Sequence, residues 1–174
     1  GASHVYPDAF ERYAQAIPPS ERGDFLGAYH RRLTSPDWAE RVRAARAWAR
    51  WEGETISIAG PSALPSRFNE DRFVEAFARI ENHYFVNGGF FESDGWLLEQ
   101  APRLRGIPCR IAQGRYDMCT PMRSAWDLKQ RWPEAELEII GDAGHSSLEP
   151  GIVDALVRGT DWMIDKGGWG SLAP

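Results

Sequence analysis

An alternation of apolar strand-like runs and helical runs, beginning at Gly106, is the feature that most constrains the fold of this chain. In chain order, the predicted elements are a strand over 107–112, a helix from 120 to about 132, a strand over 136–140 and a helix from 150 to about 164. This order is typical of a parallel sheet that is covered by helices. The C-terminal part of the chain is therefore expected to be an α/β structure.

Each predicted strand leads into a glycine-containing turn that carries one chemically active side chain. The first turn, G-R-Y-D, presents Asp117, and the second, A-G-H-S, presents His145. In a catalytic triad, a carboxylate fixes the tautomer of the histidine that acts as general base. Asp117 and His145 are therefore predicted to be catalytic residues. The alternative is structural: Asp117 would cap the following helix, and His145 would be an ordinary turn residue.

The first 96 residues have a helical pattern instead. Predicted helices cover 10–16, 20–33, a segment from Ser35-Pro36 to about 52, and about 71–85. On the last two of these, Glu52 and Glu81 fall where the periodicity requires an apolar residue. A carboxylate on a buried face is costly unless a cation meets it, so both glutamates are candidate ligands of a cationic group. Arginines of the same helices, such as Arg46, Arg50 or Arg79, could instead neutralise them.

Composition narrows the class of partner. The chain has 174 residues, is 43% hydrophobic and 26% charged, and carries a formal net charge of -5. No basic run indicates nucleic-acid binding or a polybasic membrane anchor, and no apolar run approaches the roughly 20 residues that span a bilayer. Cys109 and Cys119 are too few for a disulfide framework or a zinc ribbon. A small-molecule partner, reduced thiols in the cytoplasm and no metal or cofactor are expected.

Several motifs in a fixed order carry a resemblance to one family. They are G-A-S-x-V-Y-P-D-A-F-E, A-Y-H-R-R-L, W-A-R-W-E, I-E-N-H-Y-F, G-R-Y-D, P-M-R-S-A-W-D-L and A-G-H-S. The chain resembles the prolyl aminopeptidases, or proline iminopeptidases, of the α/β-hydrolase superfamily. The resemblance implies an all-helical cap domain followed by the C-terminal part of an α/β-hydrolase core. Its boundaries would be 1–5 for the end of a core segment, 6–96 for the cap, 97–166 for the core and 167–174 for a tail.

The resemblance also implies an activity, which is the release of N-terminal proline from peptides by a serine exopeptidase. In this family the triad runs in the order serine, acid, histidine, which matches Asp117 followed by His145. The serine is expected on an N-terminal segment that the chain lacks, so the chain alone is expected to be inactive. Ser171, in the terminal G-G-W-G-S, follows no strand and is not expected to be the nucleophile.

Substrate-binding roles follow from the same resemblance. Glu52 and Glu81 match the glutamates that bind the free α-amino group of the substrate. Cys119 and Thr120, the second and third residues after the acid, match positions that line the proline pocket, although the family often has its cysteine third. The expected partner is a small peptide with a free N-terminal proline, and association into a homo-oligomer is left open. The alternatives are another capped α/β-hydrolase, either an esterase or an epoxide hydrolase, and a truncated binding module without catalytic activity.

Overall fold

The computed structural model describes residues 1–58 and 66–165, which form two compact units. Within these ranges, the first unit comprises residues 1–55 and 66–96, and the second comprises residues 56–58 and 97–165. Residues 59–65 and the expected tail with Ser171 lie outside the described residues. None of the helices in the described ranges combines the length and apolar character that a membrane span requires.

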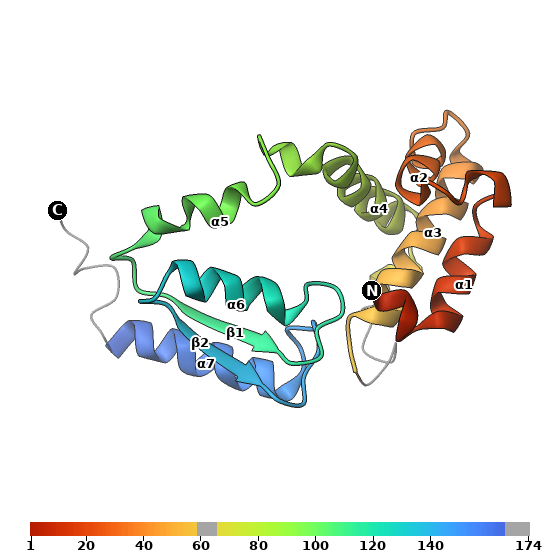
Figure 1. The fold of residues 1–174 in the computed structure, drawn as a ribbon. Helices are drawn as coiled ribbons and strands as arrows, with labels where there is room; N and C mark the ends of the chain where they lie inside the picture. Colours follow the sequence, from red (N-terminus) through yellow and green to blue (C-terminus); the bar gives the residue numbers. More distant parts are fainter. Residues whose placement is uncertain (59–65, 166–174) are drawn as a thin grey trace. The chain divides into compact units, whose positions relative to one another are not determined.

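The described elements of the first unit are helices (Figure 1). They are η1 (Ala2–His4), α1 (Pro7–Gln15), η2 (Pro19–Glu21), α2 (Phe25–Leu33), α3 (Trp38–Thr55), η4 (Ser66–Asn69), α4 (Asp71–Val86) and η5 (Gly88–Phe90). The four predicted helices correspond to α1–α4, but the start predicted for the second, at Ser20, is wrong. Asp24 is the N-cap of α2, because its Oδ1 accepts a hydrogen bond from Gly27 N at 2.9 Å.

An aromatic core holds these helices together. Tyr29 is 0% exposed and stacks on Tyr13 with ring centroids 4.5 Å apart, while Trp48 meets the Tyr29 ring edge-on at 5.4 Å. The hydroxyl of Tyr29 donates to the backbone oxygen of Tyr13 at 2.7 Å, so its polar atom is satisfied inside the core. Burial raises the pKa of Tyr29 well above its usual value, which keeps this donor protonated.

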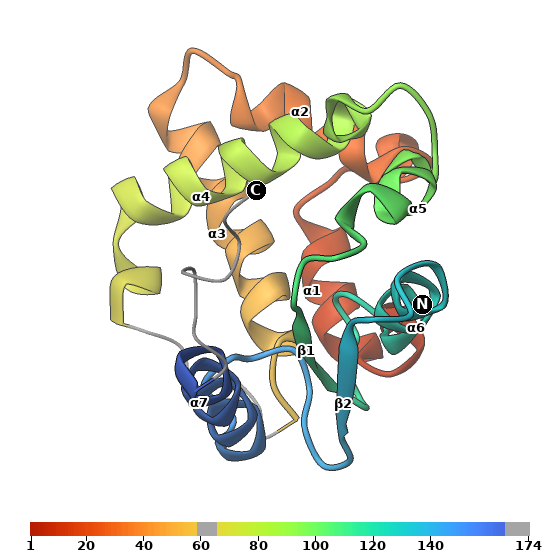
Figure 2. The ribbon, with the colours of Figure 1, turned by 90° about the vertical axis from the view of Figure 1, so that its left-hand side faces the viewer.

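The second unit has the predicted strand-helix order. Its elements are α5 (Trp96–Gln100, shared at its first residue with the first unit), η6 (Ala101–Leu104), β1 (Arg110–Gly114), α6 (Met122–Arg131), β2 (Glu136–Ile140) and α7 (Pro150–Asp165). The two strands pair in parallel, with Arg110 opposite Glu136, and α6 and α7 cover opposite faces of the pair (Figures 1 and 2). The first strand begins at Arg110, three residues later than predicted, and Pro108, which has no backbone N–H to donate, precedes it. The short helix α5 was not predicted from its turn-rich sequence.

Gly114 joins the two loops that follow the strands. A Cβ atom at this position would overlap the carbonyl oxygen of Gly144 and come within 2.7 Å of that of Ala143. Only glycine permits this approach without displacing the backbone. Arg115 N donates to Ile140 O and Tyr116 N to Ala143 O, both at 2.9 Å. The loop after β1 is thus fixed against the loop after β2.

Candidate active site

Asp117 accepts hydrogen bonds at both of its carboxylate oxygens. Its Oδ1 accepts from Cys119 N at 3.0 Å and from Thr120 N at 2.8 Å. Its Oδ2 accepts from Gln113 Nε2 at 3.1 Å and from Thr120 Oγ1 at 2.9 Å. Burial acts to raise the pKa of Asp117, but hydrogen bonds from Thr120 and His145 outweigh it, and the pKa lies below its ordinary value. The group is therefore an ionised acceptor at neutral pH.

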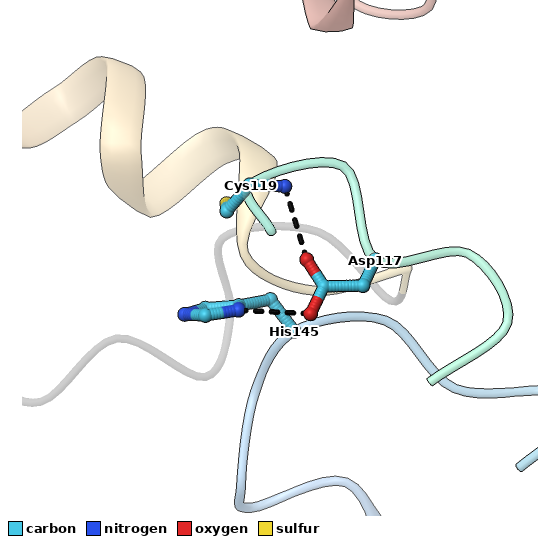
Figure 3. Close-up of side chains that lie close together, drawn as sticks. All are labelled: Asp117, Cys119 and His145. Atoms are coloured by element: carbon cyan, nitrogen blue, oxygen red, sulfur yellow. Dashed lines mark hydrogen bonds and ion pairs between the residues drawn. The ribbon is translucent and has the colours of Figure 1, made fainter. Parts of the chain in front are cut away.

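His145 meets this carboxylate directly. Its Nδ1 lies 3.0 Å from Asp117 Oδ2, and the side chains of Asp117 and His145 are 6% and 40% exposed. Because the carboxylate is ionised, Nδ1 carries the proton and donates it, which leaves Nε2 as the basic nitrogen. Figure 3 shows that this second ring nitrogen points away from Asp117. A buried acid thus orients an accessible imidazole, as general-base chemistry requires.

Cys119 and Thr120 lie in the same cluster. The Thr120 hydroxyl bonds the Asp117 carboxylate and lies 3.1 Å from His145 Nδ1, so this residue, predicted to line the proline pocket, also contacts the pair. Cys119 has no histidine near it in the sequence, yet its Sγ lies within 4.8 Å of a ligand atom of His145 (Figure 3). The sequence spacing of 26 residues between them concealed this proximity.

Asp117, Cys119 and His145 each place a potential metal ligand atom within 4.8 Å of the other two. Chemically, thiolate, imidazole and carboxylate would suit a zinc ion. However, the two oxygens of Asp117 already accept hydrogen bonds from backbone amides and from the side chains described above. A metal ion would have to displace several of these donors, so the geometry favours an acid–histidine pair over a metal centre.

Glu52 and Glu81 belong to the helical unit, on α3 and α4. Both are partly buried, and Glu81 Oε2 accepts from Trp48 Nε1 at 2.8 Å. Glu52 lies one helical turn after Trp48, on the same face of α3. Burial raises the pKa of Tyr13, and the negative charge of Glu52 adds to that rise. Trp48 therefore bonds Glu81 as well as packing in the aromatic core.

The arginines that could have neutralised these glutamates bind other carboxylates. Arg46 pairs with Asp71, Arg50 with Glu54, and Arg79 with Glu75. On α2, His30 Nδ1 lies 2.8 Å from the amide oxygen of Asn82, Oδ1, within the packed helices. These three arginines are therefore engaged at other carboxylates of the helical unit.

In an α/β-hydrolase, the last two members of the triad are an acid and a histidine at the carboxyl ends of parallel strands. In this chain, Asp117 and His145 follow β1 and β2 in the same way. The chain belongs to this family, since the model of the alpha/beta hydrolase fold matches residues 2–151. The fold class predicted from the strand-helix pattern is confirmed at this level.

Individual relatives carry a more specific name. The chain is 53% identical to the proline iminopeptidase of Xanthomonas citri over 92% of its own length, and 51% identical to that of Arabidopsis thaliana over 94%. It is 41% identical to the proline iminopeptidase of Neisseria gonorrhoeae over 95% of its length. The predicted resemblance is thus confirmed. The chain spans about half the length of these curated relatives, namely 51%, 43% and 52%.

Proposed function

We propose that this chain is the part of a prolyl aminopeptidase that supplies the general base, its orienting acid and the groups that bind the substrate amine. The complete enzyme would release N-terminal proline from peptides by acyl transfer. The observation that carries the proposal is the 3.0 Å contact between Asp117 Oδ2 and His145 Nδ1 at the ends of two parallel strands. The similarity to proline iminopeptidases over more than nine-tenths of the chain supports the choice of reaction.

In this proposal, a serine hydroxyl from polypeptide outside these residues attacks the carbonyl carbon of the substrate proline. His145 Nε2 removes the serine proton as the bond forms, and the imidazolium is stabilised by Asp117. The tetrahedral intermediate expels the amine of the next residue, which takes the proton from His145. Water, activated by the same nitrogen, then hydrolyses the acyl-enzyme and frees proline.

Selectivity for a free terminus would come from Glu52 and Glu81. At neutral pH the amine of an N-terminal proline is cationic, whereas an internal peptide nitrogen is neutral. Two partly buried carboxylates favour the first and penalise a ligand that leaves them unpaired. Within this proposal, residues 6–96 are the helical cap, residues 1–5 end a preceding core segment, and residues 97–166 are the C-terminal part of the core. Cys119 and Thr120 would border the proline pocket.

The serine-bearing polypeptide would also complete the sheet. Within residues 1–58 and 66–165, β1 pairs with β2 alone, and its other edge has no strand partner. Parallel sheets rarely stand as two strands with an open edge, because unpaired backbone groups invite further pairing. A cytoplasmic setting fits two cysteines that are present as thiols, Cys109 and Cys119. Homo-oligomerisation is a prediction that sizing of the full-length protein would test.

His145→Ala in the full-length protein is the test of this proposal. Turnover of a proline arylamide is expected to fall by at least about 10⁴-fold, because the base is lost while binding groups remain. The matched control is His4→Ala, an exposed histidine of the helical unit, which should leave turnover unchanged. An N-acylated proline arylamide should be a poor substrate for the unaltered enzyme. Full activity of His145→Ala would refute the proposal, and equal turnover of the blocked substrate or of simple esters would favour an esterase.

A further inference from the structure

Glu149 lies between the His145 loop and the first residue of α7. Its backbone oxygen accepts from Val153 N at 2.9 Å, which is the first hydrogen bond of that helix, and Pro150 follows at the first helical position. The carboxylate does not cap the helix but turns back to the loop. Its Oε2 accepts from Gly144 N at 2.7 Å, and its Oε1 accepts from Ile58 N at 3.3 Å.

The short segment Ile56–Ile58 forms the other side of this arrangement. The carbonyl oxygen of Ile56 accepts from His145 N at 3.0 Å and from Ser146 N at 2.8 Å. Three consecutive backbone N–H groups, those of residues 144–146, are therefore satisfied by Ile56 and Glu149. All of these groups belong to the α/β unit.

These acceptors hold the loop in addition to the hydrogen bond from Tyr116 N to Ala143 O. Residues 143–146 have no regular secondary structure, and Gly144 is buried. A Cβ at Gly144 would lie 3.1 Å from Glu149 Oε1 and 3.4 Å from Ile56 O, so the loop is closely surrounded by the two acceptors. A buried backbone N–H that loses its acceptor is costly, so loss of the carboxylate would shift the loop or admit water.

We propose that Glu149 is a positioning residue for His145. It does not touch the substrate; it anchors the loop to Ile56–Ile58 and so maintains the 3.0 Å contact between His145 Nδ1 and Asp117 Oδ2. The proposal rests on the proposed function for its catalytic consequence, but not for the anchoring itself. A misplacement of about 1 Å at a catalytic group can lower a rate by about 10²-fold, which sets the scale of the expected effect.

The test compares Glu149→Ala with Glu149→Gln, which retains one carbonyl acceptor of the two carboxylate oxygens. In the 174-residue chain, amide hydrogen exchange at residues 144–146 should be fastest in Glu149→Ala, intermediate in Glu149→Gln and slowest in the unaltered chain. In the full-length protein, kcat for a proline arylamide should fall about 10- to 100-fold in Glu149→Ala and less in Glu149→Gln, with KM within about twofold. Glu134→Ala, which removes an exposed glutamate bonded to Arg105, is the matched control and should change neither measurement.

Each outcome decides a different step. Unchanged exchange at residues 144–146 in both variants would overturn the anchoring role. Faster exchange with unchanged kcat would overturn the positioning role and leave a purely structural contact. Should His145→Ala retain full activity, the proposed function fails, and the exchange measurement still decides whether Glu149 anchors the loop. If Glu149→Ala does not fold, Glu149→Gln gives the same comparison with one acceptor preserved.

Discussion

The helical unit and the α/β unit bury their apolar side chains very differently. The helical unit has a continuous core in which Tyr29, Ile17 and Leu33 are each 0% exposed. In the α/β unit, both strands together contain one buried residue, Gly114. Helix α7 leaves Leu156 46% and Val157 53% exposed.

The difference indicates that the α/β unit, rather than the helical unit, has apolar side chains left uncovered by the residues present. A helix with an apolar face that remains open, beside strands buried only in part, is typical of a sheet that continues beyond the residues present. A hollow of about 640 Å³ lies between the strands and α7, lined by side chains such as Ile111, Leu137 and Leu156. The helical unit would then be stable by its own core, whereas the α/β unit would gain its stability when the remaining core strands pack on it.

The largest effect on stability is expected in the helical core. Tyr29→Ala removes a fully buried ring and its hydrogen bond to Tyr13, and should lower the free energy of unfolding by about 3–5 kcal/mol. Leu156→Ala in the same chain should cost less than about 1 kcal/mol, because nearly half of the residue is already exposed. Urea denaturation of both variants measures the contrast.

The full-length protein extends this comparison. If core strands cover α7 there, Leu156→Ala should cost about 2–5 kcal/mol, as for other buried leucines. An equally small cost in the chain and in the full-length protein would show that the face of α7 stays open, and would contradict the continued sheet.

Substrate recognition provides the next contrast, because the two units are proposed to act on different kinetic constants. Glu52→Gln removes a charge from the helical unit and should raise KM for proline arylamides by about 10- to 100-fold, the range that a hydrogen bond to a charged group represents. Its kcat should change little, whereas His145→Ala lowers kcat. Glu40→Gln, on the same helix α3, is the matched control. An unchanged KM for Glu52→Gln would contradict the amine-binding role.

Much of the division into a helical unit and an α/β unit could be predicted from the sequence, because it depends on local sequence patterns. The strand-helix alternation and the turns with Asp117 and His145 depend on periodicity and glycine placement, which a sequence displays directly. The contact of Cys119 with the pair, the indole of Trp48 on Glu81 and the anchoring by Glu149 could not be predicted in this way. Some of these contacts join residues that are far apart in the chain. In the others, the direction of the side chain depends on an irregular loop, which has no sequence periodicity to reveal it. The start of α2 was wrong for a related reason, since Ser20 and Asp24 are both acceptable caps and only tertiary packing selects between them.

The smallest effect is a pH dependence confined to the helical unit. Hydrogen bonds from Arg32 and then Arg31 lower the pKa of Glu21 from 4.5 to about 2. A carboxylate whose pKa is lower in the folded state stabilises the fold fully above the ordinary value, and this contribution is lost as the pH falls through the folded one. The loss should therefore occur between about pH 4.5 and pH 2. Because Glu21 is on the surface, solvent and salt screen the pair and the effect is modest.

Chemical denaturation of Glu21→Gln and of the unaltered chain measures this contribution. The variant should be less stable than the unaltered chain at pH 7, and the difference in stability should shrink toward pH 2. A difference that stays constant with pH would show that the ion pairs with Arg31 and Arg32 do not contribute through the charge of Glu21.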